Sequence, residues 1–492
     1  MPSGTVTKAF RRLFCVCVMG RIVRHQPKKG DPIMLFASPA VNATGPKATR
    51  IDMFSFSTPQ MRAFHVTWLA FFVCFFAWFA AAPLMPLIKA EFGLTKDQIA
   101  NINIAAVAVT VLVRLIVGPL CDRFGPRRAY TWLLLIGSIP VFGLAFAQTY
   151  EAFLFFRLAI GAIGASFVIT QYHTSVMFAP NVVGTANATV GGWGNAGGGA
   201  AQSLMPLIVA AMIGLGVEQA FGWRVAMFVP GVTMLIMAFV YAKYTQDTPQ
   251  GDIVDLRAQG IEIESGKKGG MAILGQAAAN YRTWMLAITY GACFGVEIFI
   301  HNIAASYYVD EFGLSLASAG MAAGIFGGLA LFARALGGIA SDRIALVKGL
   351  DGRALLLFAL MLGEGIGLLA FGYAPSVGLA ILAMTIFGIF THMACGATYA
   401  LVPFVDRKAL GGVAGLIGAG GNIGAVAAGF LNKASATPQD TLITLGYIVA
   451  GCSLCAIAVR FSAAHKSVEQ KLFDEAVEMR RADAAMTGAV AA

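Results

Sequence analysis

The sequence predicts an all-α membrane protein with twelve transmembrane helices in two pseudo-symmetric six-helix bundles. Three observations support this fold class: the composition, the number of long apolar segments and an internal repeat. Hydrophobic residues make up 58% of the 492 residues and charged residues only 12%, too few charges to cover a soluble surface of this size. The chain is therefore expected to cross a membrane many times.

The apolar segments are each roughly 20 residues long, the length that crosses a hydrocarbon core of about 30 Å. The predicted spans are 64–88, 98–121, 129–148, 152–177, 185–213, 224–243, 283–308, 316–340, 353–373, 376–400, 409–432 and 439–463. They divide the chain into a cytoplasmic N-terminal tail (1–62), a first bundle (63–243), a cytoplasmic linker (244–282), a second bundle (283–463) and a cytoplasmic C-terminal tail (464–492). The N-terminal tail has a second interpretation, in which the start is misassigned and the protein begins at Met53 or Met61.

The repeat relates the two bundles, because three separate matches share one offset of 220 residues. The matches pair Glu91 to Leu94 with Glu311 to Leu314, Arg114 with Arg334, and Gly118, Asp122 and Arg123 with Gly338, Asp342 and Arg343. A shared offset over this length indicates a duplicated half.

The net charge of +10 reflects membrane topology and does not indicate a nucleic-acid partner. Lys and Arg gather in alternate loops, thirteen in the proposed inside loops between helices against four in the outside loops. The positive-inside rule then places both termini in the cytoplasm. We expect a multi-pass protein of the plasma membrane, which in a bacterium is the inner membrane.

The cysteines suggest no disulfide framework and no metal site. Six of the eight lie in or at the ends of predicted spans, where they are expected to be small core residues. No metal and no cofactor is expected. Because no nucleotide-binding loop or nucleophile constellation stands out, the chain is not expected to be an enzyme.

The loop after the second predicted span carries a sequence signature. It reads Gly118-Pro-Leu-Cys-Asp122-Arg123-Phe-Gly125-Pro-Arg127-Arg128, and a shorter copy with Gly338, Asp342 and Arg343 follows the eighth span. The signature resembles that of the major facilitator superfamily. A carboxylate at the end of a helix can pair with arginines and neighbouring helix ends, so these residues are predicted to latch the cytoplasmic side. Topogenic positive charge alone is the alternative interpretation.

Arg114 and Arg334 each lie eight residues before the loop aspartate, which is about 12 Å into the membrane on a helix. A guanidinium at this depth costs at least about 2.5 kcal/mol and calls for a functional explanation. Its planar fork of donors suits a small planar oxyanion. Neutralisation by a buried carboxylate is the structural alternative, but the duplicated helices offer no acid near either arginine.

The fifth and eleventh spans are rich in glycine and carry one asparagine each, Asn195 and Asn422, at an offset of 227 residues. Glycine weakens a helix by up to about 1 kcal/mol relative to alanine, and close helix crossing can compensate. The predicted crossing glycines are Gly191, Gly192, Gly194, Gly197, Gly198, Gly199, Gly418, Gly420, Gly421 and Gly424. Ordinary small-residue packing is the alternative, but it does not demand the asparagines, which are predicted to contact substrate or an opposite glycine backbone.

The paired Gly-Asn motifs and the two arginines resemble the nitrate/nitrite porter family of the major facilitator superfamily, over about 64–463. The amino-acid sequence at 54–68 is particularly similar to that of the assimilatory branch, which includes plant high-affinity nitrate transporters. The resemblance implies that Arg114 and Arg334 bind the anion with help from Asn195. It also implies an aromatic sandwich around the flat ion, formed by Phe75, Phe167, Tyr290 and Phe294.

Glu297 follows Tyr290 at i+7, on the face that Phe294 shares at i+4. This carboxylate is the candidate for proton coupling, and the alternative is a structural Glu bonded to another helix. Arg157, followed by Gly161 and Gly164, resembles a second superfamily motif and either relays charge or anchors its helix. Four further polar residues of the spans are expected to serve packing: His173, His301, His392 and Glu364.

The predicted function is secondary active transport of nitrate, with nitrite as a further substrate, by alternating access. Proton symport is favoured because accumulating an anion against an inside-negative potential costs about 2.3 kcal/mol per 100 mV. The alternatives are nitrate/nitrite antiport, transport of a small carboxylate such as oxalate or formate, and a non-transporting nitrate sensor. A monomer is expected, and an accessory subunit stays open.

Overall fold

The computed structural model describes residues 47–179, 181–261 and 270–471, together with 474, 475, 478 and 481. The predicted tail residues 1–46 and 482–492, and residues 262–269 of the predicted linker, lie outside these ranges. All of the described residues belong to one compact unit.

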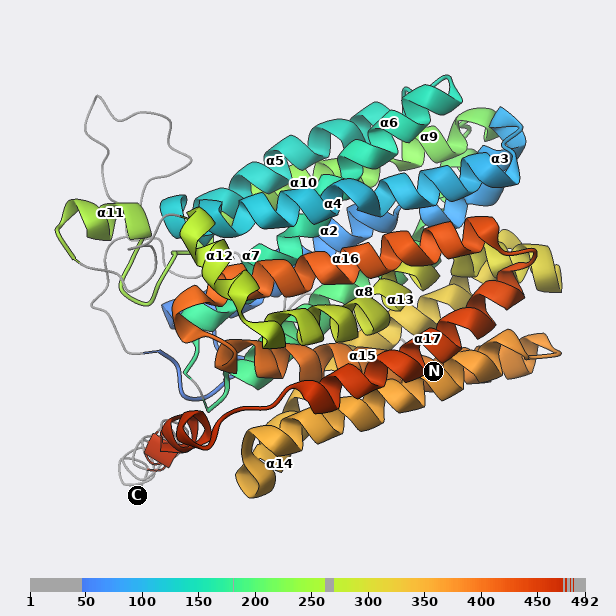
Figure 1. Ribbon diagram of the computed structural model, residues 1–492. Coiled ribbons are helices and arrows are strands. Elements are labelled where there is room, and N and C mark those ends of the chain that lie inside the picture. Colours follow the sequence, from blue (N-terminus) through green and yellow to red (C-terminus); the bar gives the residue numbers. More distant parts are fainter. Residues whose placement is uncertain are drawn as a thin grey trace, which may run out of the picture. The chain divides into compact units, whose positions relative to one another are not determined.

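The described part of the chain is almost entirely helical (Figure 1). The first half consists of α2 (Pro59–Phe79), η2 (Ala82–Leu84), α3 (Met85–Phe92), α4 (Lys96–Phe124), α5 (Pro126–Leu144), α6 (Tyr150–Ile160), η3 (Gly161–Ala165), α7 (Ser166–Met177), α8 (Val183–Gly214), η4 (Gln219–Phe221), α9 (Gly222–Ala226) and α10 (Phe228–Tyr244). The second half consists of α13 (Tyr281–Phe312), α14 (Leu316–Gly372), α15 (Val377–Leu401), η5 (Val402–Phe404), η6 (Arg407–Ala409), α16 (Leu410–Ala434) and α17 (Pro438–Ala458).

Ten of the described helices are long and apolar enough to cross a membrane. One of them, α14, contains the eighth and ninth predicted spans, which are divided at Gly349 by a non-helical backbone (φ 57°, ψ −145°). The third predicted span is α5, a 19-residue helix that carries Arg127 and Arg128 in its first turn. With α14 counted as two and α5 added, the helices match the predicted twelve.

The repeated Glu-Phe-Gly-Leu sequence ends an equivalent helix in each half. Gly93 caps α3 with φ 61° and Gly313 caps α13 with φ 65°, a left-handed conformation that glycine adopts without steric cost. The amide of the following leucine then bonds back into the last turn, from Leu94 to the Lys89 carbonyl (3.1 Å) and from Leu314 to the Tyr308 carbonyl (3.3 Å). This part of the repeat is therefore a helix stop signal.

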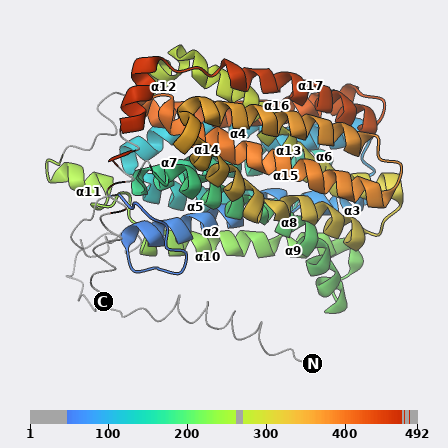
Figure 2. The same cartoon turned by 90° about the horizontal axis from the view of Figure 1, so that it is seen from below.

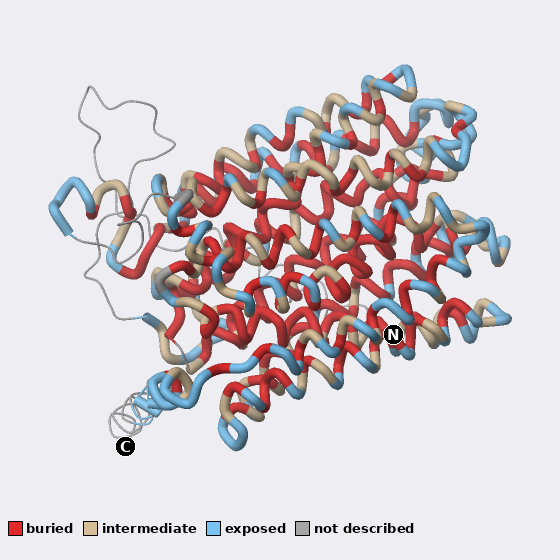
Figure 3. The backbone as a smooth tube through the Cα atoms, viewed as in Figure 1, coloured by how far each residue is buried: buried red, intermediate tan, exposed pale blue. Residues whose placement is uncertain are grey.

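Buried residues lie mostly on the sides of the helices that face one another (Figure 3). Many large apolar residues are exposed on the outside. Leu112, Ile139 and Leu454 are 63%, 67% and 63% exposed, although each belongs to a helix. Such surfaces are tolerated when lipid replaces water as the surrounding solvent. The helices thus bury their polar residues inward and present apolar residues outward.

The predicted crossing glycines lie where helices approach each other. A Cβ atom added at any of the ten would lie within 4 Å of an atom from a different helix. At Gly199 it would lie 2.7 Å from the Gly327 carbonyl carbon of α14, and at Gly420 it would lie 2.6 Å from the Ala287 carbonyl oxygen of α13. Close packing of α8 on α14 and of α16 on α13 explains the glycine content of both helices.

The predicted linker contains two short helices, α11 (Ile253–Ala258) and α12 (Gly270–Ala279), at the same end of the bundle in both views (Figures 1 and 2). α12 packs on α16, because a Cβ at Gly412 would lie 2.8 Å from the Ile273 carbonyl oxygen. The segment just before α11 is also held in place, by hydrogen bonds and an ion pair with α5. The Asp247 carboxylate accepts bonds from the amides of Arg127 (2.8 Å) and Ile253 (2.9 Å), while the Arg127 side chain pairs with Asp252.

Burial and the nearby Asp252 carboxylate raise the pKa of Asp247 to about 7. An unfolded chain has an aspartate pKa of about 3.9, so between about pH 4 and 7 the unfolded state releases a proton that the folded state keeps. Stability therefore falls as pH rises through this window, by about 1.4 kcal/mol per pH unit at most, and the effect is complete above pH 7.

The variant Asp247→Asn cannot ionise, so it should lose this pH dependence. We expect its melting temperature, relative to wild type, to rise as the pH of the detergent solution is raised from 5 to 7.5. Tryptophan fluorescence during heating measures both proteins. A difference in melting temperature that stays constant with pH would contradict the assignment.

Candidate functional site

Arg114 and Arg334, one from each half, are buried and face the same aromatic ring. Their side chains are 0% and 2% exposed. The guanidinium carbon of Arg114 lies 5.1 Å from the Phe294 ring centroid, and that of Arg334 lies 5.8 Å from it. The repeat therefore brings its two arginines to one place between the halves, as the sequence predicts.

Arg114 is held by carbonyl oxygens. Its Nε and Nη2 donate to the Gly164 carbonyl at 3.2 and 3.0 Å, and its Nη1 donates to the Gly418 carbonyl at 2.5 Å. The amide orientation of Asn422 that satisfies both side chains lets its oxygen accept from Arg114 Nε and Nη1, each at 2.9 Å. Among the described residues no carboxylate forms a hydrogen bond or ion pair with Arg114, so its charge is uncompensated there.

Arg334 differs, because here the structural alternative of a buried carboxylate partner applies. Its Nη2 forms an ion pair with the Glu297 carboxylate of α13, although the duplicated helices themselves offer no acid. Glu297 and Arg334 are 37 positions apart in the sequence and lie on different helices. The spacing of residues along a single helix therefore cannot reveal the pair. A carboxylate therefore neutralises Arg334, while none among the described residues pairs with Arg114.

Glu297 forms the centre of a buried polar cluster. Asn195 Nδ2 of α8 donates to its Oε1 at 2.7 Å, and Cys395 Sγ of α15 donates to its Oε2 at 3.4 Å. His392 Nδ1 lies 3.7 Å from the same Oε2. Asn195 thus contacts the carboxylate, and not an opposite glycine backbone, across the interface between the halves.

Three of the four predicted aromatic residues stack together beside Arg114. Tyr290 and Phe294 are one turn apart on α13 and their rings are nearly parallel, 4.8 Å between centroids and 6° between planes. Phe167 of α7 stacks on both, at 5.9 and 5.6 Å. Phe75 is one ring away: its ring contacts in the described chain are Phe71, Trp78 and Phe79, and Phe71 contacts Phe167.

Tyr399 of α15 completes the aromatic cluster, and sequence reasoning missed it. Its ring meets those of Phe167 and Tyr290 edge to face, at 4.8 and 4.9 Å. The signal was available, because Tyr172 and Tyr399 are 227 residues apart, the same offset as the two asparagines. Cys395 and His392 gave no comparable signal, since their role depends on how α15 packs on α13.

The two loop aspartates each face the first turn of a helix in the opposite half. Asp342 accepts from Thr185 of α8, through the amide (3.1 Å) and the hydroxyl (2.6 Å), and from Arg353 at 2.8 Å. Asp122 accepts from the Tyr172 hydroxyl at 2.9 Å, and a Cβ at Gly411 of α16 would lie 3.5 Å from it. Carboxylates favour the positive end of a helix dipole. This geometry suits the predicted latch.

The other latch residues contribute unequally. Gly118 lies where α4 meets α16, but a Cβ there would make only an ordinary van der Waals contact with the Gly411 carbonyl oxygen (3.5 Å), so the packing itself does not require glycine. The Arg123 carbonyl accepts from Arg257 at 2.9 Å. Arg127 is buried in the Asp252 pair, Arg128 is half-buried, and Arg343 is exposed.

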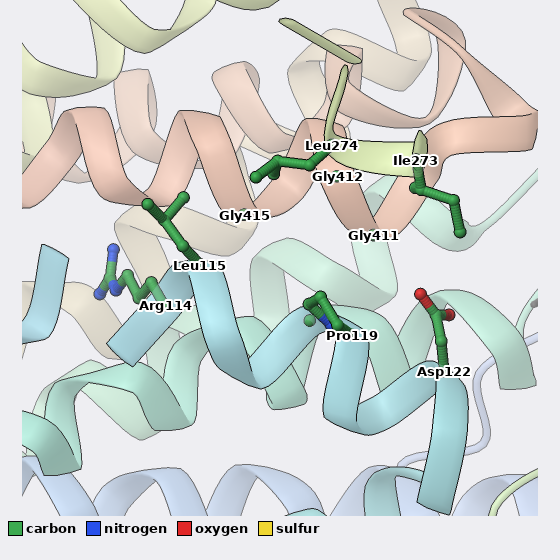
Figure 4. A pocket seen from close by; sticks show the side chains of 10 residues that line it. Arg114, Leu115, Pro119, Asp122, Ile273, Leu274, Gly411, Gly412 and Gly415 are labelled. Carbon is green, nitrogen blue, oxygen red and sulfur yellow. The ribbon is translucent and has the colours of Figure 1, made fainter. Parts of the chain in front are cut away.

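Both ends of the interface are closed. At the end opposite the latch, Lys96 donates to the carbonyls of Ser435 (3.0 Å) and Ala436 (3.2 Å), and Lys433 donates to Asn101 at 3.0 Å. Between Arg114 and Asp122 lies a cavity of about 10 Å³, room for about one water molecule (Figure 4). The two arginines are therefore enclosed from both sides.

The remaining polar residues of the spans divide into two kinds. His173 is satisfied by Tyr241 (2.7 Å) and the Gln246 carbonyl (2.8 Å), in line with the expected packing role. Glu364 and His301 are fully buried, yet neither has a hydrogen-bond partner for its side chain in the described ranges. These two are not ordinary satisfied packing residues.

The comparisons with known proteins agree on one family for this chain. Residues 67–429 match the Major Facilitator Superfamily. The high affinity nitrate transporter 2.5 of Arabidopsis thaliana is 40% identical over 83% of this chain and 81% of its own length. The nitrate/nitrite transporter NrtP of Nostoc punctiforme is 29% identical over 83% of this chain and 94% of its own.

Among solved structures, the fucose:proton symporter of E. coli is similar in fold. The TM-score is 0.55 at 13% sequence identity, over 81% of this chain and all of the symporter. With the twelve-helix arrangement and the matched relatives, the predicted fold class is confirmed, and the chain is a transporter and not an enzyme. It belongs to the Major Facilitator Superfamily and, within it, to the nitrate/nitrite porter family that contains these relatives.

Proposed function

We propose that this chain transports nitrate, and nitrite as a further substrate, by alternating access with Arg114 and Arg334 as the anion-binding pair. The observation that carries the proposal is the buried Arg114 guanidinium, which has carbonyl and amide partners but no carboxylate in the described chain. A permanent cation enclosed in a membrane protein favours an anion beside it. The names of the matched relatives supply the identity of that anion.

The aromatic cluster supports a flat ligand. The Phe294 ring lies near two guanidinium groups, that of Arg114 from the first half and that of Arg334 from the second. The rings of Phe167 and Tyr290 stack roughly parallel to the Phe294 ring. The Tyr290 hydroxyl is buried without a partner in the described chain, so it is free to donate. A planar oxyanion fits between stacked rings and accepts bidentate bonds from an arginine fork.

Glu297 supports coupling to protons by competition. Its carboxylate occupies Arg334 in this structure, so an anion gains that guanidinium only when Glu297 gives it up. Protonation removes the negative charge and releases Arg334. Because linkage is reciprocal, a bound anion then favours the proton as much as the proton favours the anion. Symport follows, and it supplies the energy that uptake against an inside-negative potential requires.

The orientation in the membrane belongs to the same proposal. The latch end carries most of the basic loop residues, and the positive-inside rule assigns that end to the cytoplasm. Lys96 and Lys433 then lie on the outside. The two halves, each with its own arginine, form the site without a second copy of the chain, which supports a monomer.

Replacing either arginine by lysine tests bidentate recognition. We expect Arg114→Lys and Arg334→Lys to weaken nitrate binding by about ten- to a hundredfold, since losing one charge-assisted hydrogen bond costs about 1.5–3 kcal/mol. Calorimetric titration of purified protein with nitrate measures the change. Arg224→Lys is the matched control, because Arg224 is also buried but pairs with Glu91 (2.6 Å) outside the site.

The same titration decides the substrate class. Formate and oxalate added as competitors should displace nitrate weakly from wild type. If either carboxylate binds more tightly than nitrate, or if both lysine variants bind nitrate as wild type does, the proposal is wrong.

Glu297→Gln tests the coupling. The glutamine keeps the hydrogen-bonding shape but never competes for Arg334, so nitrate binding should no longer depend on pH. In wild type we expect affinity to rise as pH falls. In proteoliposomes the variant should exchange nitrate for nitrate at a rate similar to wild type, yet fail to accumulate it when a pH gradient is imposed.

Flux measured with a nitrate electrode separates the outcomes. Accumulation by Glu297→Gln equal to that of wild type would exclude Glu297 as the coupling residue. Accumulation by wild type that ignores the pH gradient would exclude symport and favour nitrate/nitrite exchange.

A further inference from the structure

Arg157 of α6 is also buried, and the proposed site does not use it. Its side chain is 1% exposed. Nη1 donates to the Trp78 carbonyl at 3.0 Å, and Nη2 donates to Asn302 Oδ1 at 3.3 Å, while Nε is buried without a partner in the described ranges. No carboxylate among the described residues forms an ion pair with it. Arg157 therefore has both a spare donor and an uncompensated charge.

Arg157 lies between the central arginines and the Lys96 end. Asn101 Nδ2 donates to the Tyr150 hydroxyl at 3.3 Å, so α4 and α6 begin at that same end. Arg157 is seven residues into α6, and Gly164, whose carbonyl binds Arg114, follows seven residues later. Along a helix seven residues span about 10 Å, so Arg157 is about that distance nearer to the Lys96 end than the site is.

Asn302, the side-chain partner of Arg157, continues into a row of polar residues at the interface between the halves. Asn302 and His301 are adjacent on α13, and Gln202 Nε2 of α8 donates to the His301 carbonyl at 2.5 Å. The rings of Phe79 and His301 are 4.9 Å apart, next to Trp78, which binds Arg157. Both His301 ring nitrogens and Gln202 Oε1 have no partner in the described chain. We call Arg157, Gln202, His301 and Asn302 the outer layer.

We propose that the outer layer is a second binding station for the transported anion, a small planar oxyanion, on its route between the Lys96 end and the Arg114–Arg334 site. The proposal rests on the proposed function for the identity and direction of the anion. Its own support is the uncompensated guanidinium with its unpaired Nε, together with the unpaired polar atoms of His301 and Gln202 at the same interface. Groups of this kind are costly in a membrane interior unless a ligand visits them.

The Arg157–Asn302 hydrogen bond determines when the station is available. It joins α6 of the first half to α13 of the second, so opening the Lys96 end separates its two atoms. The freed guanidinium then attracts the anion from outside. When the halves close again, Asn302 returns as the partner of Arg157, and the anion passes inward to Arg114. The closed structure corresponds to the stage after this transfer.

The test separates capture from equilibrium binding. We expect Arg157→Gln to lower kcat/KM for nitrate entering from the Lys96 end about tenfold, while its Kd, measured by calorimetry in detergent, stays within threefold of wild type. Arg157→Lys should recover most of the capture rate, because attraction needs only a positive charge. Lys89→Gln is the control for charge at the same end, since Lys89 is half exposed and 3.9 Å from Asp310; its capture rate should be unchanged.

A second variant keeps the test decisive if Arg157→Gln folds poorly. Asn302→Asp keeps Arg157 in place but gives it a carboxylate, which should compete with the anion and lower capture without raising the unfolding rate. Unchanged capture in both variants overturns the station. Equal losses of capture, affinity and melting temperature in Arg157→Gln and Arg157→Lys would show a helix anchor instead. If the wild type does not bind nitrate, the proposed function itself is wrong, and this outcome is independent of the variants.

Discussion

The cost of placing a guanidinium inside a membrane protein constrains the whole arrangement. Each buried arginine of the spans needs oxygen partners, and the helices are positioned to supply them. Gly164 and Gly418 offer carbonyls to Arg114 because glycines let η3 and α16 approach α4 closely. Glu297 offers a carboxylate to Arg334. The glycine-rich helices and the central arginines therefore depend on each other, because close backbone approach supplies the carbonyl partners that make the buried charge tolerable.

The two halves satisfy the same requirement differently, and the difference is useful. Arg114 is matched by neutral groups, whereas Arg334 is matched by an acid that Asn195 of the opposite half also holds. In the proposed mechanism, Arg114 has no carboxylate that competes with a ligand, whereas Arg334 becomes available only when Glu297 is protonated. A symmetric pair of arginines with neutral partners would bind an anion but would have no means of linking it to a second ion.

Much of this could be predicted from the sequence, since hydrophobic length, glycine density and the repeat are local or internally matched signals. The twelve spans, the family and the meeting of Arg114 with Arg334 follow from them. The Glu297–Arg334 pair, the contact of Cys395 and the position of Phe75 depend on how helices rotate against each other, which no single-helix pattern records. The C-terminal tail also makes contacts with distant segments that no local pattern indicates: Glu469 pairs with Arg407 at 2.5 Å and Lys466 with Asp351 at 2.5 Å.

The contacts that close the two ends differ in strength, and this has a consequence for the resting protein. The Lys96 contacts are hydrogen bonds to carbonyls at the surface, and a hydrogen bond contributes only about 0.5–1.5 kcal/mol net. Asp342 at the other end is 16% exposed and bonded to both Thr185 and Arg353. An empty transporter should therefore spend more time open at the Lys96 end, so its conformational equilibrium is biased toward waiting for cargo from that side.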